Sequence, residues 1–252
     1  MEFIKIKEYL DSLYSPSLKA SYDNVGLMVG SLKKEVNTIL LALDLTREVM
    51  DEAIKKNVDL IITHHPLLFK PLYMIDTDSD PGSIIKDLIK YDIVNFSLHT
   101  NFDSAKMNDY LSSLIGIENK EVLSIKENCG VIGTIKKTSL KDYVKVIKDA
   151  FKIDECEYYG EKNLSIEKVA ICGGSGSSFF MDALNKGADL YITGDVSYSR
   201  GIEAKRMGLN VLNVGHFIES LYVNVLKKDL SKLDKSFEII KSKVNPVPYI
   251  KF

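Results

Sequence analysis

Apolar and polar positions alternate along the chain in two patterns. Continuous apolar runs of strand length occupy residues 38–45 and 58–63, and residues 46–57 between them have the spacing of an amphipathic helix. Residues 1–18 also have helical spacing, with too many polar positions for a signal peptide. This alternation predicts an α/β fold with at least partly parallel sheets.

The same order of strand and helix returns in the second half. "EAIKKNVDLIIT" at 52–63 aligns with "DALNKGADLYIT" at 182–193, and "YDIVNFSLHTNFD" at 91–103 aligns with "MGLNVLNVGHFIE" at 207–219. We therefore expect an internal duplication that gives two similar α/β halves. The polar segment 116–130 lies between the copies, which predicts a first domain at 1–122 and a second at 123–252.

Composition narrows the function classes. The net charge of -2 gives no general attraction to nucleic acid or to anionic membranes, and no stretch approaches the length of an apolar membrane span. We therefore expect a cytoplasmic protein with no membrane partner. The three cysteines are widely spaced without a CxxC pair, which predicts reduced thiols rather than a disulfide framework or a cysteine zinc site.

All four histidines of the chain follow predicted strands. His64 and His65 follow 58–63, His99 follows the strand in 91–98, and His216 follows 209–214. In open α/β sheets, functional groups gather beyond the carboxyl ends of strands. Two acids lie close behind, Asp103 four residues after His99 and Glu219 three residues after His216.

Imidazole and carboxylate are the usual ligands of Zn²⁺, Mn²⁺ and Fe²⁺. A single histidine is more often a structural residue, but the complete set predicts a metal site. Neighbouring strand residues point in opposite directions, so His64 and His65 suit two ions, one each, better than one. His99 is a ligand, an orienting residue or a proton carrier.

Several motifs together resemble the NIF-three-like family, whose members are often called GTP cyclohydrolase 1 type 2 homologues. The resemblance spans residues 22 to 219 in order. The motifs are "YDNVGLMVG" (22–30), "THHP" (63–66), "HTNFD" (99–103), "CGGSGSS" (172–178), "ITGD" (192–195) and "GHFIE" (215–219).

This resemblance implies a dinuclear metal site between the two halves and assembly into a homohexameric ring. It implies that His64 and His216 hold one ion, that His65 and Asp103 hold the other, and that Glu219 bridges both. Family members often have a further histidine after the second-half "TG". This chain has Asp195 and Tyr198 there, so no role is carried over to them.

Other motifs leave alternatives open. "GGSGSS" is either a phosphate cradle or a tight strand-to-helix turn that needs small residues. Asp23 and Asn24 either form a local Asx turn or line a pocket beside the metals. Tyr158, Tyr159, Tyr191 and Tyr198 either pack or stack on a base. Cys172 is not expected to be a nucleophile, because no histidine lies near it in the sequence.

A dinuclear centre points to metal-assisted hydrolysis. The first hypothesis is a metal-dependent hydrolase of a small nucleotide or phosphorylated substrate, with two divalent ions (Zn, Fe, Mn or similar) and with His99 and Glu219 as catalytic residues. The second is a metal-binding scaffold or regulatory protein without turnover. A weaker third is nucleic-acid binding by the assembled ring, with an affinity that falls steeply with salt.

Overall fold

The computed structural model describes residues 1–162 and 164–249, which divide into two compact units. Unit 1 contains residues 1–105 and the chain from Ser220 onward, and unit 2 contains Lys106–Glu219. Over the described part of the chain, no helix has the length and apolar character that crossing a membrane requires.

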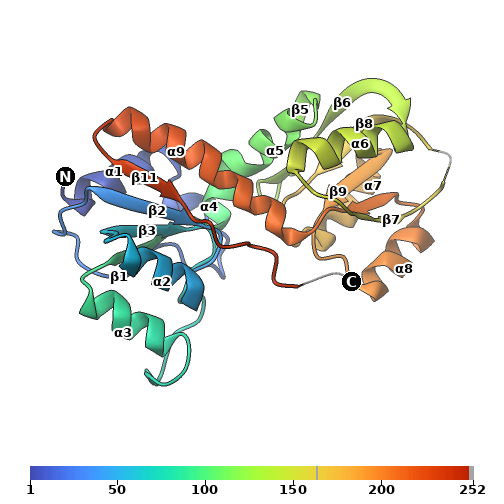
Figure 1. Cartoon of the computed structure of the whole chain (residues 1–252). Coiled ribbons are helices and arrows are strands. Elements are labelled where there is room, and N and C mark those ends of the chain that lie inside the picture. Colours follow the sequence, from blue (N-terminus) through green and yellow to red (C-terminus); the bar gives the residue numbers. More distant parts are fainter. Residues whose placement is uncertain (163, 250–252) are drawn as a thin grey trace. The chain divides into compact units, whose positions relative to one another are not determined.

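The sheet of unit 1 has the strand order β1-β4-β3-β2-β11 (Figure 1). Strands β11, β2, β3 and β4 run parallel, and β1 runs antiparallel to β4 at the edge. The strands are β1 (Gly26–Val29), β2 (Thr38–Ala42), β3 (Leu60–Thr63), β4 (Val94–Ser97) and β11 (Glu238–Lys241).

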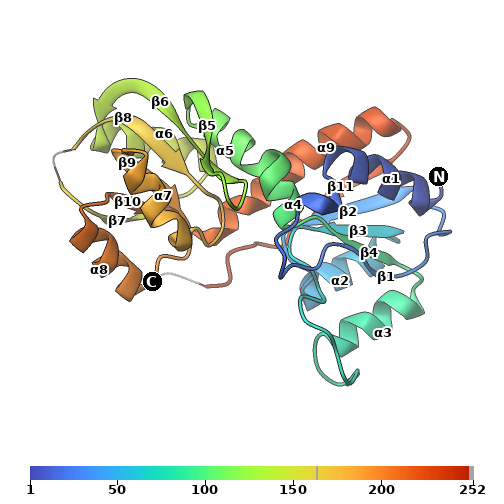
Figure 2. The same ribbon diagram turned by 180° about the vertical axis from the view of Figure 1, so that it is seen from behind.

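Helices cover both faces of this sheet, with α1 and α9 on one face and α2 and α3 on the other (Figures 1 and 2). The face under α2 and α3 is apolar: Leu40 and Ile61 of the strands pack with Met50 and Leu88 of the helices. The helical elements are α1 (Phe3–Leu13), η1 (Pro16–Leu18), α2 (Arg47–Lys55), α3 (Gly82–Lys90), α4 (Thr100–Phe102), the start of the π-helical turn η2 (Asp103–Met107), and α9 (Tyr222–Leu233).

The sheet of unit 2 has the order β5-β6-β8-β9-β10-β7, with β8, β9 and β10 parallel. Strands β7 and β6 run antiparallel to β10 and β8, and β5 forms a hairpin with β6. The strands are β5 (Glu118–Ser124), β6 (Cys129–Ser139), β7 (Glu157–Tyr159), β8 (Ser165–Ile171), β9 (Leu190–Thr193) and β10 (Val211–Asn213).

The core of unit 2 forms where α7 and α8 pack on the sheet, around the fully buried Tyr191. The Tyr191 ring lies 5.8 Å from that of Phe180, and its hydroxyl donates to the Gly176 carbonyl, so this tyrosine packs. The helical elements are α5 (Asn108–Leu114), α6 (Leu140–Phe151), η3 (Ser177–Phe179), α7 (Phe180–Asn185), α8 (Tyr198–Met207) and the 3-10 segment η4 (His216–Leu221), which ends in unit 1.

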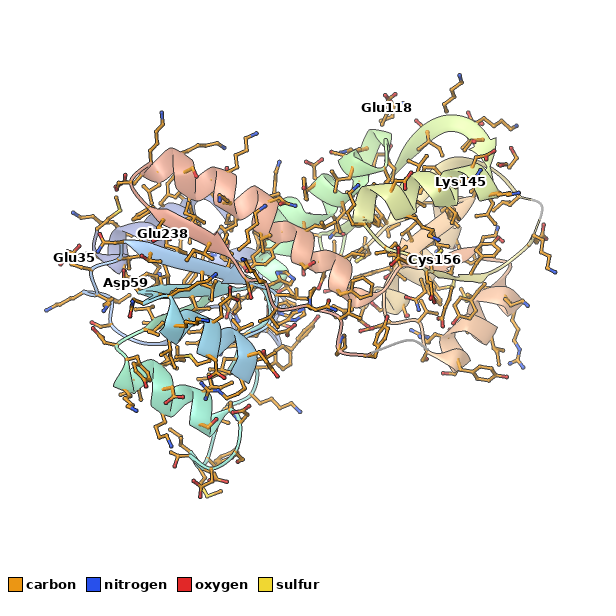
Figure 3. All side chains as sticks on the ribbon, viewed as in Figure 1. Glu35, Asp59, Glu118, Lys145, Cys156 and Glu238 are labelled. Atoms are coloured by element: carbon orange, nitrogen blue, oxygen red, sulfur yellow. The ribbon has the colours of Figure 1, made fainter. Side chains whose placement is uncertain are left out.

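Both units contain the same hydrogen-bonded corner. In unit 1 the Asp59 carboxylate accepts the backbone N–H groups that open β2, Asn37 at 2.9 Å and Thr38 at 3.0 Å. In unit 2 Asp189 accepts the N–H groups of Glu167 and Lys168 at 2.9 and 2.7 Å. Figure 3 shows Asp59 and Glu238 at the same end of the strands of this sheet, and Glu238 pairs with Thr38.

The predicted domain boundary at residue 122 differs from this division in two respects. It cuts through β5, because the polar segment 116–130 forms the β5–β6 hairpin rather than a connection. It also assigns the C-terminal segment to the second domain, whereas β11 pairs with β2 and belongs to unit 1. The ends of the predicted domains therefore differ from the ends of the compact units.

Candidate metal centre

The adjacent histidines of unit 1 stand where the chain turns after β3. The backbone N–H groups of His64 and His65 both donate to the Leu43 carbonyl, at 3.2 and 3.0 Å. A regular strand would send the two side chains to opposite faces. The shared acceptor marks a turn, and the two rings lie with their centroids 5.2 Å apart.

His99 completes a three-histidine group in unit 1. Its ring centroid lies 5.2 Å from that of His64 and 5.5 Å from that of His65. One ring nitrogen from each of the three histidines lies within 4.8 Å of the others, which is a spacing that a metal ion can use. The strand ends of β3 and β4 bring these residues together because the two strands are parallel neighbours.

Two of these rings are each oriented by a carboxylate of their own. His65 Nδ1 lies 2.7 Å from Asp44 Oδ1, and His99 Nδ1 lies 2.8 Å from Asp23 Oδ1. A carboxylate can only accept, so each Nδ1 carries the proton and donates it. In the neutral form of each ring the lone pair is then on Nε2, the arrangement typical of carboxylate-oriented metal ligands.

Asp23 has hydrogen-bond partners both beside it in the sequence and in the histidine group. Its carboxylate accepts the N–H of the adjacent Asn24 at 2.8 Å and also receives bonds from His99 and Thr100. Burial alone would raise its pKa, but the bonds from His99 and Thr100 outweigh burial and lower the pKa to about 2. Asp23 is therefore a buried, ionised anchor for His99.

His64 is the fully buried member of the group. Its Nε2 lies 3.4 Å from Asp103 Oδ1, and its ring packs 5.4 Å from that of Tyr222. Asp103 begins a π-helical turn directly after the short helix α4, and its carboxylate approaches His64.

Unit 2 carries the second histidine and carboxylate set. His216 and Glu219 lie in a 3-10 helix, where residues at i and i+3 align, and His216 Nε2 is 3.0 Å from Glu219 Oε2. His216 Nδ1 lies 2.5 Å from Asp195 Oδ2. Burial alone would lower the pKa of His216, but Glu219 and Asp195 together raise it to about 9.

Asp195 therefore has a contact that its sequence motif did not reveal. It orients His216 in unit 2 as Asp44 orients His65 in unit 1, and in both pairs the acid precedes the histidine by 21 residues. In each pair the acid follows one parallel strand and the histidine follows the next strand along the chain. This sequence signal could have identified Asp44 and Asp195. Tyr198, in contrast, is 81% exposed at the start of α8.

The glycine-rich loop gives Glu219 its space. A Cβ on Gly174 would lie 2.5 Å from Glu219 Oε1, and the φ of Gly174 is +62°, a conformation that favours glycine. The N–H groups of Gly173 and Gly176 are donated to Asn108 Oδ1 and Thr193 Oγ1. These contacts match the tight-turn interpretation, since two amides of the loop are used within the unit.

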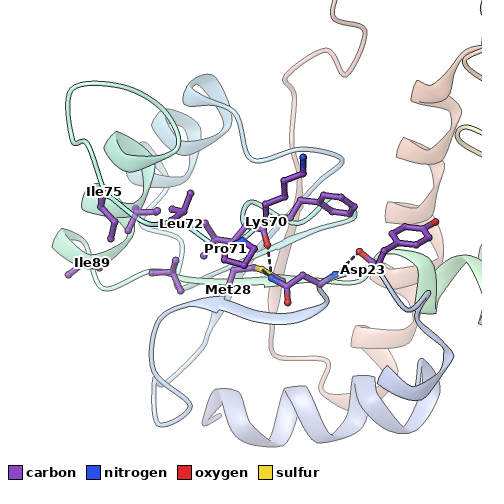
Figure 4. A pocket seen from close by; sticks show the side chains of 13 residues that line it. Asp23, Met28, Lys70, Pro71, Leu72, Ile75 and Ile89 are labelled. Carbon is purple, nitrogen blue, oxygen red and sulfur yellow. Dashed lines mark hydrogen bonds between the residues drawn. The ribbon is translucent and has the colours of Figure 1, made fainter.

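A pocket of about 680 Å³ lies in unit 1 beside Asp23 (Figure 4). Its walls are mainly apolar, and Asn24 closes one side by donating to the Leu68 carbonyl at 2.6 Å. Phe69 lines the pocket, and its ring lies 6.2 Å from that of His99. Further lining residues are Met28, Lys70, Pro71, Leu72, Ile75 and Ile89.

Comparison with known proteins gives consistent matches over the whole chain. A family model described as Duf34/NIF3 (NGG1p interacting factor 3) matches residues 1–248. A Clostridium perfringens protein named GTP cyclohydrolase 1 type 2 homolog is 39% identical, with 99% of each chain covered. A Streptococcus pneumoniae protein of the same name is 38% identical, with 90% of this chain and 91% of the relative covered.

Solved structures agree with these matches. A Bacillus cereus protein related to NIF3 superposes with a TM-score of 0.91 at 26% identity, covering 99% of each chain. Reduced HcgD from Methanocaldococcus jannaschii superposes with a TM-score of 0.86 at 29% identity, covering 97% of this chain and 98% of its own.

Proposed function

The chain belongs to the Duf34/NIF3 family, and from this premise we propose that it is a dinuclear metal-dependent hydrolase of a small nucleotide or phosphorylated substrate. The observation that supports metal binding is the three-histidine group of unit 1, with one ring nitrogen of each within 4.8 Å of the others. Two of these rings are oriented by carboxylates, as metal-binding histidines usually are. The assignment to two ions and to hydrolysis comes from the family resemblance.

We propose the ligand assignment that the family resemblance implies. His64 and His216 would hold one ion, His65 and Asp103 would hold the other, and Glu219 would bridge both. The support is chemical: each unit supplies imidazole nitrogen and carboxylate oxygen, a donor set that accepts Zn²⁺, Fe²⁺ or Mn²⁺. Gly174 supports the role of Glu219, because a side chain there would occupy the space of the carboxylate.

Two divalent ions bound by these residues would supply Lewis acidity and lower the pKa of water. The protein supplies the remaining requirements. Asp23 holds the proton on His99 Nδ1 and leaves the lone pair on Nε2, so His99 would first accept a proton at Nε2 and then donate it to the leaving group. Glu219 and Asp103 supply negative charge that offsets the charge of the ions.

We propose that the pocket of unit 1 receives the substrate. Its volume of about 680 Å³ lies within the usual range of small-ligand sites, roughly 300–1,000 Å³. Apolar walls suit a base or another planar group, and Asp23 and Phe69 place the pocket next to His99. Relatives named GTP cyclohydrolase 1 type 2 homolog make a nucleotide the first substrate to test.

We infer that the two α/β plans arose by duplication. In support, the parallel strands follow the same order in the two sheets, β4-β3-β2 and β10-β9-β8. Asp59 and Asp189, which align in the two sequence copies, also bind the equivalent pair of backbone amides. A homohexameric ring and a cytoplasmic location stay predictions from the family resemblance and from the composition.

Metal content tests the ligand assignment directly. Purified wild-type protein should contain about two transition-metal ions per chain by elemental analysis, as the dinuclear proposal requires. His65→Ala and Glu219→Ala should each lose most of this metal. Glu238→Ala is the matched control, because Glu238 is an exposed glutamate on β11, and its metal content should equal that of the wild type. Unaltered metal in both site variants would refute the assignment.

Turnover is tested separately. Metal-reconstituted wild-type protein should hydrolyse at least one member of a panel of nucleotides and phosphoesters, with Glu219→Ala as the blank. If the two proteins agree on every substrate while the wild type retains its metal, the non-catalytic metal scaffold becomes the better description. Product formation that survives His99→Ala unchanged would contradict the role of His99 as the proton donor.

A further inference from the structure

Two cysteines of unit 2 that are 43 residues apart in the sequence meet in the fold. Cys129 opens β6 and Cys172 directly follows β8, and their Sγ atoms lie 3.6 Å apart. Because β6 and β8 pair directly, the two thiols stand on neighbouring strands of one sheet. Their spacing in the sequence gives no sign of this contact, and the metal centre proposed above uses neither sulfur.

Gly130 explains how the two side chains can face each other. Val131 pairs with Ile171, so Gly130 stands opposite Cys172, and Cys129 lies one residue further along. In a regular strand this offset would direct the two cysteines to opposite faces. Gly130 has a φ of +73°, which interrupts the alternation, and a Cβ there would approach Leu123 side-chain atoms to 3.0 Å.

The two thiols differ in access and in acidity. Cys129 is partly exposed, whereas Cys172 is 3% exposed. The pKa of Cys129 is lowered, first by its hydrogen bond with Cys172 and further by the Gly130 N–H and the Asn108 amide, which together outweigh the opposing effects of burial and of Glu219. Cys129 is thus the thiol that a reagent reaches first, and Cys172 stands behind it.

We propose that Cys129 and Cys172 form a thiol–disulfide exchange site, which a low-molecular-weight disulfide such as oxidised glutathione converts into an intramolecular disulfide. The Cys129 thiolate attacks one sulfur of the reagent and forms a mixed disulfide, and one thiolate leaves. Cys172 then loses its proton and attacks the Cys129 sulfur, releasing the second thiol. The protein loses two electrons and two protons, and the reagent is reduced to two thiols.

Closing this bond acts on the loop that holds Glu219. The sulfurs must approach from 3.6 Å to about 2.05 Å, the length of a disulfide bond. Cys172 is followed by Gly173 and Gly174, which lie against the Glu219 carboxylate. Oxidation is therefore expected to change metal affinity, a consequence that rests on the proposed function, whereas formation of the disulfide does not.

The test equilibrates the full-length protein in glutathione buffers of increasing oxidised fraction and quenches it with an alkylating reagent. Intact mass and peptide mapping then follow the three thiols. The wild type should lose the mass of two hydrogen atoms and yield a Cys129–Cys172 linked peptide that dithiothreitol removes. Cys172→Ser should stop at a single glutathione adduct on Cys129, because the resolving thiol is absent.

Cys156→Ser is the matched control, and it should form the disulfide as the wild type does. Three free thiols in every buffer, or a glutathione adduct on wild-type Cys129 that never resolves, would overturn the proposal. A disulfide that forms without any change in metal affinity would overturn the link to Glu219 alone. Because mass and thiol count need no bound metal, failure here is distinguishable from failure of the metal assignment.

Discussion

Three histidines of this protein each contact an aspartate through the same ring nitrogen. His65, His99 and His216 each direct Nδ1 at a carboxylate, of Asp44, Asp23 and Asp195 respectively. An anionic acceptor fixes both the tautomer and the orientation of the ring. The acids thus orient three of the four histidines in the same way, two in unit 1 and one in unit 2.

Asp23 gives this pairing a measurable effect on stability. Its pKa is about 2 in the folded protein against an ordinary value of 3.8. Because the folded-state pKa is the lower one, ionised Asp23 stabilises the fold above about pH 4, and this contribution is lost as the pH falls toward about 2. The shift corresponds to about 2 kcal/mol. The free energies of unfolding of wild type and Asp23→Asn should therefore differ most above about pH 4 and converge in acid.

Urea unfolding followed by circular dichroism at a series of pH values measures this difference. Asp154→Asn provides the control, because Asp154 is exposed and lies away from the histidines along the chain. A gap between wild type and Asp23→Asn that stays constant down to about pH 2 would show that the carboxylate charge does not stabilise the fold.

The histidines and acids predicted as site residues all follow strands, and this position is the basis of the prediction. The strand ends of a parallel sheet gather at one edge, so a residue there can be assigned to a site without knowing the structure. Asp44 and Asp195 also follow strands, but their partners lie one strand away, and only the pairing of strands identifies them. The Cys129–Cys172 contact depends on a local break at Gly130, which no periodicity reveals.

At the level of elements, the parallel strands were predictable and the edges of the sheets were not. Strands β2, β3 and β9 are largely or wholly buried and read as continuous apolar runs. Most residues of β5 and all residues of β7 are at least partly exposed, and both strands carry polar residues. A polar edge strand resembles a loop in sequence, so its place is decided by distant hydrogen-bonding partners.

Helix α9 shows how a distant segment is held in unit 1. The hydroxyl of the buried Tyr222 lies 2.7 Å from the Ala42 carbonyl and 2.9 Å from the Ile62 carbonyl, at the ends of β2 and β3. Tyr222→Phe keeps the ring but removes the donor from two buried acceptors. We expect the free energy of unfolding to fall by about 1–3 kcal/mol.

Chemical denaturation of wild type and Tyr222→Phe measures this loss. Tyr73→Phe is the matched control, because Tyr73 is fully exposed, and its unfolding midpoint should equal that of the wild type. An unchanged midpoint in Tyr222→Phe would mean that the hydroxyl does not anchor α9 to the sheet.

At the level of the whole molecule, unit 1 is built from two stretches of the chain that are separated by all of unit 2. The chain completes most of unit 1, passes through all of unit 2 and then returns to unit 1 with α9 and β11. The returning segment adds a parallel strand beside β2 and contributes the buried side chains of Leu226 and Leu230. The alignment of the two sequence segments does not predict this return, because β11 lies after residue 219, where the second aligned segment ends.

The unit boundaries predict which fragments fold. Residues 106–219 contain every strand of the second sheet and helix α5, so this fragment should unfold cooperatively in urea. Residues 123–252, the second domain predicted from sequence, lack α5 and most of β5 and carry α9 without the sheet that covers it. We expect the second fragment to be less stable and more prone to aggregate, because its apolar helix face has no partner. Circular dichroism during urea unfolding compares the stability of the two fragments, and sedimentation compares their aggregation. Greater stability of 123–252 would favour the boundary at residue 122.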